Sequence, residues 1–143
     1  MAPAALSAVG VVLIAEDFED TREMYSYFLS MRGWQVVEAA NGLEVLPLVA
    51  AHGPDVIVMD LSMPGIDGWE LTQRLKADDA TAPVPVVVLT GHVLPAERAR
   101  AEAMGCDSFL SKPCLPGALE RELERFVTRK GDKGHCGAGQ CVA

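Results

Sequence analysis

A short apolar run between two carboxylates constrains the fold of this chain most strongly. Residues 55–60 are Asp-Val-Ile-Val-Met-Asp, and residues 61–68 are rich in turn-forming types. Four consecutive apolar residues that stop at a turn are typical of a strand buried on both faces of a parallel sheet. Asp60 then lies at the carboxyl end of that strand, the edge where open α/β sheets bind ligands. A single acid there is usually an ordinary strand end, so Asp60 becomes a candidate for chemistry only if other groups join it.

Similar apolar runs recur along the chain and alternate with helical patterns. The predicted strands cover 11–15, 34–37, 55–60, 86–90 and 107–111. A helix is predicted after each strand, either from apolar residues at helical spacing or from residues that typically begin or end a helix. The predicted helices cover 24–31, 41–52, 69–75, 95–104 and 119–127. Crossovers of this length suit right-handed parallel connections. The repeat therefore predicts an α/β fold with a doubly wound, five-stranded parallel sheet.

The helical patterns also predict helix ends and buried faces. Gly33 is placed to end the first helix, and Asn41 is the expected N-cap of the second. Pro47 inside the second helix is expected to kink or shorten it. Leu115 and Pro116 give the last helix no good N-cap. In the first helix an i, i+3, i+4, i+7 stripe predicts the buried face, and it consists of Met24, Tyr27, Phe28 and Met31.

The chain length of 143 residues suits one domain with a substantial core. We expect an N-terminal tail at 1–9, the domain at 10–129 and a disordered tail at 130–143, because the last segment has four glycines and no periodicity. That segment supplies only three possible metal ligands, so a metal site there is not favoured. These ligands are His135, Cys136 and Cys141.

Composition limits which partners and which cellular compartment we expect for this protein. With 20 acidic and 12 basic residues, the net charge of -8 repels nucleic acid and anionic membranes, so we expect neither as a partner. The apolar N-terminal stretch lacks a basic start and is shorter than the ~18 residues of a membrane span. The four cysteines form no paired CxxC motif, and the 50% hydrophobic content needs no disulfide framework. We therefore expect reduced thiols and a cytoplasmic protein.

Polar groups follow several of the predicted strands. Glu16 and Asp17 follow the first strand, Thr90 ends the fourth, and Lys112 follows the fifth. Because parallel strands share one carboxyl edge, we expect these groups to meet Asp60. Crowded carboxylates favour a hard divalent cation such as Mg²⁺. A carboxylate nucleophile, Mg²⁺, a lysine and a hydroxyl are the parts needed to accept a phosphoryl group.

The same residues resemble a known family. Residues 10–129 are similar to the receiver domain of two-component response regulators, in the acidic pair after the first strand, the Asp-x-x-Met-Pro-Gly-x-Asp-Gly segment from Asp60, the pair Thr90-Gly91, and Phe109 followed by Lys112-Pro113. The resemblance implies a flavodoxin-like (βα)5 fold with strand order 2-1-3-4-5. It also implies a phosphorylation-switched signalling domain that catalyses only its own phosphotransfer and dephosphorylation.

The resemblance assigns a role to each site residue. Asp60 would take a phosphoryl group from a phosphohistidine on a histidine kinase or phosphotransfer protein, and Lys112 would contact the phosphate. Thr90 and Phe109 match the family's switch pair. Partners would be the phosphodonor and an unidentified downstream protein, with a phosphorylation-dependent dimer left open. The Mg²⁺ contacts implied are Asp17, Asp60 and the Ser62 backbone carbonyl, with Glu16 acting mainly through water.

Three other functions were compared with the sequence, and two of them do not fit it. An aspartyl-phosphate hydrolase needs a second acid two residues after its nucleophile, where this chain has Ser62. A flavin-binding protein needs a phosphate-cradling loop after the first strand, but the acidic residues 16–20 would repel a phosphate. A receiver-like protein-binding module that is never phosphorylated stays open, although the complete acid, hydroxyl and lysine set argues against it.

Overall fold

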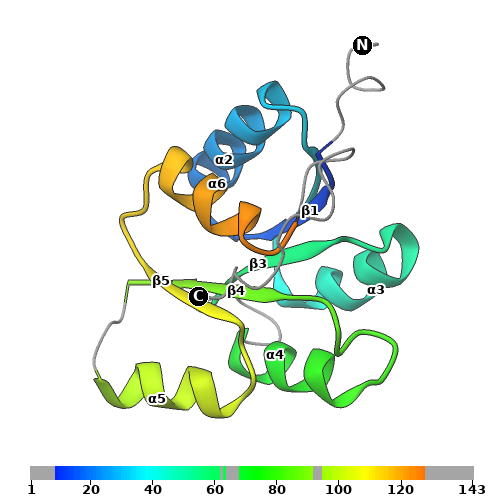
Figure 1. Ribbon diagram of the computed structural model, residues 1–143, viewed down its shortest axis with the longest axis vertical. Helices are drawn as coiled ribbons and strands as arrows, with labels where there is room; N and C mark the ends of the chain where they lie inside the picture. Colours follow the sequence, from blue (N-terminus) through cyan, green and yellow to red (C-terminus); the bar gives the residue numbers. More distant parts are fainter. Residues whose placement is uncertain (1–8, 62, 64–67, 92–94, 128–143) are drawn as a thin grey trace.

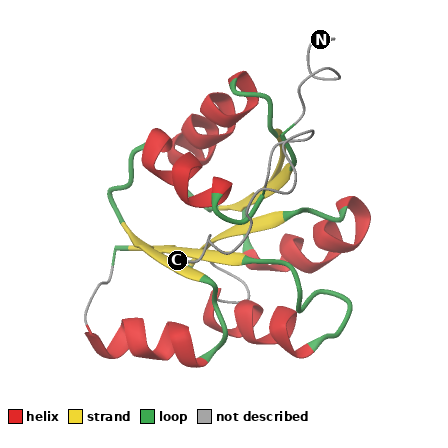
Figure 2. Cartoon of the chain, viewed as in Figure 1, coloured by secondary structure: helices red, strands yellow, loops and turns green. Residues whose placement is uncertain are grey.

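The computed structural model describes residues 9–61, 63, 68–91 and 95–127. Within these residues, five strands alternate with five helices (Figures 1 and 2). The strands are β1 (Val11–Ala15), β2 (Gln35–Ala39), β3 (Val56–Asp60), β4 (Val86–Thr90) and β5 (Ser108–Ser111). The helices are α2 (Glu19–Met31), α3 (Gly42–His52), α4 (Gly68–Ala77), α5 (Pro95–Ala103) and α6 (Pro116–Glu124).

The strands form one parallel sheet in the order β2-β1-β3-β4-β5. Helices α2 and α6 cover one face, and α3, α4 and α5 cover the other, so the molecule has three layers (Figure 1). The predicted doubly wound fold and the implied strand order are both confirmed. All strands run the same way, so their carboxyl ends share one edge.

The central strands are buried on both faces, as their apolar runs predict. Every residue of β3 and of β4 is buried. Alternate side chains enter two separate cores, because successive residues of a strand point to opposite faces. Ile57 and Met59 pack under α3, α4 and α5, whereas Val58 packs under α2 and α6. Asp60 ends β3 and is therefore held by a strand with hydrogen-bonded neighbours on both sides.

The predicted buried face of α2 is wrong. Of its four members only Phe28 packs partly against the core; Met24, Tyr27 and Met31 are 44%, 71% and 69% exposed, whereas Tyr25 and Leu29 are buried. The helix carries bulky apolar residues on two faces, which differ by a rotation of one residue, so spacing alone does not select between them. The Tyr25 hydroxyl donates to the Cys114 carbonyl at 2.7 Å, and this satisfied polar tip lets the tyrosine be buried. Gly33 follows the helix with φ 100°, as expected of a residue that ends it.

The predicted ends of α3 and α6 are mostly confirmed. The Asn41 side chain accepts from the Leu43 N–H at 2.9 Å, and α3 runs through Pro47 to His52, so the proline does not shorten it. Leu115 makes no side-chain cap at the start of α6, as expected. That helix ends at Glu124, so the predicted continuation to 127 is wrong, although Val127 is buried.

Smaller differences concern the limits of one strand and the two ends of the chain. Strand β2 starts and ends slightly later than predicted, at Gln35–Ala39. The predicted tail at 130–143, with its three candidate metal ligands, lies outside the described residues, as do residues 1–8 of the N-terminal tail. None of the helices in the described part of the chain has the length and apolar content needed to cross a membrane.

Candidate functional site

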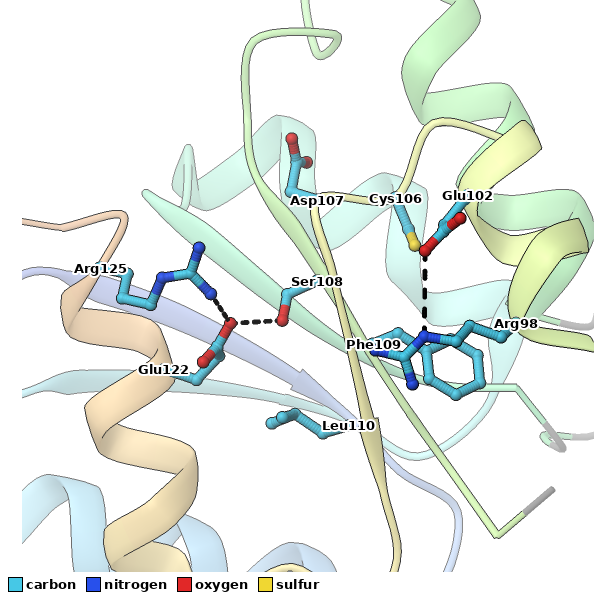
Figure 3. Close-up of a pocket in the computed structure, with 9 residues that line it drawn as sticks. All are labelled: Arg98, Glu102, Cys106, Asp107, Ser108, Phe109, Leu110, Glu122 and Arg125. Carbon is cyan, nitrogen blue, oxygen red and sulfur yellow. Dashed lines mark hydrogen bonds and ion pairs between the residues drawn. The ribbon is translucent and has the colours of Figure 1, made fainter. Parts of the chain in front are cut away.

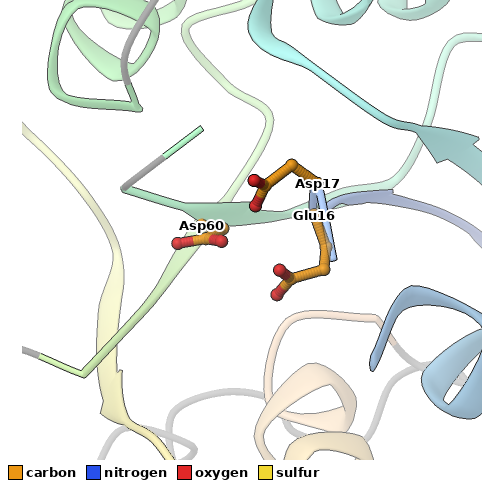
Figure 4. A group of neighbouring side chains, drawn as sticks. All are labelled: Glu16, Asp17 and Asp60. Carbon is orange, nitrogen blue, oxygen red and sulfur yellow. The ribbon is translucent and has the colours of Figure 1, made fainter. Parts of the chain in front are cut away.

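The carboxylates predicted to converge do meet at the carboxyl edge of the sheet (Figure 4). Glu16 and Asp17 directly follow β1, and Asp60 is the last residue of β3. One carboxylate oxygen from each of the three lies within 4.8 Å of the others. The pairing of β1 with β3 brings these acids together, because Ala15 lies opposite Met59 in the ladder.

Lys112 joins this cluster from the other end of the chain. Its Nζ donates to Glu16 Oε1 at 3.0 Å and lies 3.4 Å from Asp60 Oδ2. Its backbone N–H donates to the Thr90 carbonyl at 2.7 Å, which fixes the start of the lysine side chain beside the end of β4. The ammonium therefore lies between two carboxylates. The position of the lysine backbone is set by the pairing of β4 with β5.

Burial differs among the acids. Glu16 and Asp60 are 2% and 3% exposed, whereas Asp17 is exposed to solvent. Burial raises the pKa of Glu16, and neighbouring Asp60 raises it further, while the Lys112 hydrogen bond partly offsets both. Burial lowers the pKa of Lys112, but the hydrogen bond to Glu16 and the charge of Asp60 outweigh it and leave that pKa raised. The lysine therefore stays a cation.

Gly68 allows α4 to begin close to the end of β3. A Cβ at this position would lie 2.7 Å from the Asp60 carbonyl oxygen and 2.7 Å from the Leu61 Cα. Backbone atoms cannot yield as a flexible side chain does, so α4 can begin this close to β3 only with glycine. Ser62, whose carbonyl was expected to contact Mg²⁺, lies outside the described residues.

Comparison with known proteins decides the family. The sequence model of the response regulator receiver domain matches residues 12–124. The chain belongs to this family. Its relatives include the polar-differentiation response regulator DivK of Brucella anthropi, which is 32% identical over 121 residues, 85% of this chain and 96% of the relative.

Solved structures of receiver domains have the same fold. The chemotaxis protein CheY4 of Vibrio cholerae superposes with a TM-score of 0.78 at 30% identity, over 83% of this chain and 99% of that chain. The signal receiver domain of a histidine kinase from Syntrophus aciditrophicus gives a TM-score of 0.78 at 28% identity, over 91% and 98% of the two chains. Receiver domains are signalling domains, and the acidic cluster of this chain lies at the edge expected for one.

The acid cluster of this receiver domain fits Mg²⁺. Carboxylate oxygens are the ligands that this hard ion prefers, and Mg²⁺ usually keeps several of its waters. The exposed Asp17 leaves the cluster open to solvent on one side, whereas Glu16 and Asp60 are buried. Three carboxylates face one ammonium, so the cluster retains an excess of negative charge that a divalent cation would offset.

The two expected switch residues lie on neighbouring strands of the receiver domain. Thr90 ends β4 and is buried, and Phe109 on β5 is buried in the core beneath α5. The guanidinium carbon of Arg98 on α5 lies 5.2 Å from the centroid of the Phe109 ring. The aromatic ring is therefore already inside the domain, with an arginine over its outer side.

One residue near the site was not singled out from the sequence. Arg22, on α2, donates from Nη1 to the backbone carbonyl of Glu16 at 3.0 Å. Its charge is paired with Glu38 at the end of β2. Both contacts depend on how β1 and β2 pair, so no local sequence signal marks them.

Proposed function

We propose that this protein is a cytoplasmic phosphoacceptor response regulator, in which Asp60 takes a phosphoryl group from a phosphohistidine. The donor would be a histidine kinase or a histidine phosphotransfer protein. One observation carries the proposal: a buried carboxylate at the sheet edge lies beside the Lys112 ammonium, with the carboxylates of Glu16 and Asp17 within 4.8 Å. Membership of the receiver family supports the same activity.

The site residues divide the reaction between them. An Asp60 oxygen forms the new bond to phosphorus while the phosphorus–nitrogen bond breaks, and the released histidine nitrogen takes up a proton from water to give a neutral imidazole. Lys112 offers its ammonium to a phosphoryl oxygen. Glu16, Asp17 and Asp60 would hold Mg²⁺, Glu16 mainly through water, and the bound ion would neutralise charge on the transferred oxygens.

Phosphorylation of Asp60 is tested with acetyl phosphate as donor. We expect labelling of the wild-type protein in millimolar Mg²⁺, none in excess EDTA, and none for Asp60→Asn. Asp79→Asn, which alters an exposed aspartate far along the chain, is the matched control and should label normally. Full labelling of Asp60→Asn would place the nucleophile elsewhere. No labelling and no beryllofluoride binding by the wild type would favour the non-phosphorylated binding module.

The output is proposed to leave through α5, β5 and α6. A phosphoryl group on Asp60 would offer acceptors to the Thr90 hydroxyl, and a shift there would pass to Phe109 and to Arg98 above it. A cavity of about 370 Å³ lies between α5 and α6 over β5 (Figure 3). Its lining includes Arg98, Phe109 and Arg125, so movement of the switch pair would reshape a surface open to a protein partner.

Amide and side-chain NMR shifts with and without beryllofluoride test this route. We expect Phe109 and the α5 amides to respond in the wild type, and Thr90→Ala to reduce that response although the site still binds beryllofluoride. Unchanged α5 shifts in a wild-type protein whose site is occupied would show that the signal leaves by another surface.

The proposal also includes the limits of the domain, which we place at residues 10–129.

A further inference from the structure

Arg22 is held at both ends of its guanidinium. Its Nη1 donates to the Glu16 carbonyl at 3.0 Å, and its Nε donates to Glu38 Oε1 at 3.0 Å. The Arg22 side chain is 15% exposed, although it lies on a surface helix. An arginine with one partner in the sheet and one in the acidic turn has few alternative positions.

The carbonyl that Arg22 contacts belongs to the peptide group joining Glu16 to Asp17. The other polar groups of Glu16 are already engaged: its N–H donates to the Ala39 carbonyl at 3.0 Å, and its carboxylate accepts from Lys112 and from the Phe18 N–H. Because a peptide group is planar, fixing its carbonyl also fixes the direction in which the chain continues. The bond from Arg22 thus helps to fix the backbone position from which the exposed Asp17 side chain extends.

We propose that Arg22 is a positioning residue for the Mg²⁺ site, holding the Glu16–Asp17 peptide so that the Asp17 carboxylate faces Asp60. This role rests on the proposed function, because it assumes that Asp17 and Asp60 share the ion. Partners that orient a metal ligand commonly change metal affinity by about ten- to a hundredfold when they are removed. Lysine does not reproduce both contacts, since the guanidinium uses two separate nitrogens in a rigid planar fork, whereas an ammonium presents all its donors from one nitrogen.

Positioning and simple charge predict opposite effects of one substitution. If Arg22 acted only through its positive charge, Arg22→Gln would strengthen Mg²⁺ binding by removing a repelling cation. If it positions Asp17, Arg22→Gln would weaken binding in spite of the lost charge. Arg22→Lys keeps the charge and gives a second test. If only the charge matters, the dissociation constant of Mg²⁺ stays unchanged in this variant, whereas a positioning role predicts that it rises.

The experiment is a Mg²⁺ titration of the full chain, followed by calorimetry and by the fluorescence of Trp69. We expect the dissociation constant to rise about tenfold in Arg22→Gln and about as much in Arg22→Lys. Arg74→Gln, which removes an arginine from an exposed ion pair on α4, is the matched control and should bind as the wild type does. Far-UV circular dichroism and melting temperature establish that each variant is folded.

Two outcomes overturn the inference, and they are distinguishable. An unchanged or lower dissociation constant in Arg22→Gln, with normal binding by the wild type, overturns the role of Arg22 and leaves the proposed function intact. Absence of Mg²⁺ binding by the wild type overturns the proposed function, and this role with it. Acetyl phosphate labelling of the Arg22 variants should return towards the wild-type level at saturating Mg²⁺, because the nucleophile itself is unaltered.

Discussion

Helices α2 and α6 are attached to the sheet in a different way from α5. In the first pair, the buried Glu120 carboxylate on α6 accepts from Arg32 Nε at 2.9 Å and from Trp34 Nε1 at 3.1 Å. The hydroxyl of Tyr25 on α2 donates to the Cys114 carbonyl. Leu119 and Leu123 are fully buried in the same core cluster as Tyr25 and Trp34. The α2–α6 layer is therefore fixed by apolar packing together with directed polar contacts.

Helix α5 lacks most of these attachments. Within the described residues, Ala101 is the one side chain of α5 that is buried. Two arginines add contacts from the flanks, Arg98 over Phe109 and Arg100 over Trp69, the latter at 4.2 Å. Exposed cation–π contacts contribute about 0.5–1 kcal/mol each, whereas a hydrogen bond to a buried charge contributes about 1.5–3 kcal/mol.

The difference indicates where a signal can move the structure at least cost. A helix held by one small buried side chain and two arginine contacts shifts without opening a core. It is also the helix that covers Phe109, the proposed switch aromatic. Strand pairing places the acids and Lys112, and α2 and α6 pack on those strands, whereas α5 is the helix through which we propose that the signal leaves. Four predictions test this contrast, from the largest expected effect to the smallest.

Glu120→Ala should destabilise the whole domain. The substitution leaves the buried Trp34 N–H without its acceptor, and we expect a loss of about 2–3 kcal/mol in the free energy of unfolding measured in urea. Glu120→Gln, which retains an acceptor, should lose less. Glu124→Ala alters an exposed acid on the same helix and is the control. A cost no greater than that of the control would remove the basis for calling this layer rigid.

Tyr25→Phe should change how stability depends on pH. Burial, with smaller contributions from Cys114 and Glu16, raises the pKa of Tyr25 from 10.0 to about 12. Its stabilising contribution is therefore complete below pH 10 and is lost as pH rises through 12, a change of up to about 2–3 kcal/mol.

Urea unfolding at several pH values measures this effect. At pH 7 the variant loses about 1 kcal/mol with the Cys114 hydrogen bond. Between pH 10 and 12 the wild type should lose its advantage, because only its unfolded chain ionises readily there. Tyr27→Phe removes an exposed phenol from the same helix and is the matched control. Parallel pH curves for wild type and Tyr25→Phe would contradict the expectation.

Replacing both α5 arginines should loosen that helix alone. For Arg98→Ala combined with Arg100→Ala, we expect about 1–2 kcal/mol less protection of the α5 amides in hydrogen exchange, and a smaller change in global stability. Arg121→Ala, on the exposed side of α6, controls for the loss of a cation. If protection falls equally in β3 and β4, α5 unfolds with the domain and is no separate unit.

Truncation after Arg129 should have the smallest effect. The composition of the last residues offers no core, so the melting temperature and acetyl phosphate labelling should stay within a degree or so and within error of the full chain. The comparison of the two helical layers would then hold without the tail. A fall of many degrees would show that the tail packs against one of them.

The sequence is sufficient to predict the strands of the sheet but not which face of each helix is buried. The apolar runs of β3 and β4 predict buried strands because a strand covered by helices on both faces buries consecutive residues, and a run this short followed by a turn is typical of a strand. The buried face of α2 was mispredicted because the partner of Tyr25, the Cys114 carbonyl, is 89 residues away. Such a contact is fixed by tertiary packing, which has no local pattern.

The candidate site shows the same division. Glu16, Asp60 and Lys112 were predicted from their places at strand ends, since parallel topology alone brings those ends together. The contact of Arg22 with the Glu16 carbonyl was not predicted, because it depends on a backbone atom and on pairing with β2. Charge patterns in a sequence do not reveal bonds to a carbonyl.

The location of the acids and Lys112 at strand ends has a consequence for how such a protein can diversify. The exposed face of α2, with Met24, Tyr27 and Met31, supplies none of the groups in that cluster. A duplicated gene can therefore acquire new partners through substitutions on its helices while it inherits the chemistry unchanged. Arg22 is the exception on α2: at this one position, freedom to choose partners would conflict with the inherited site.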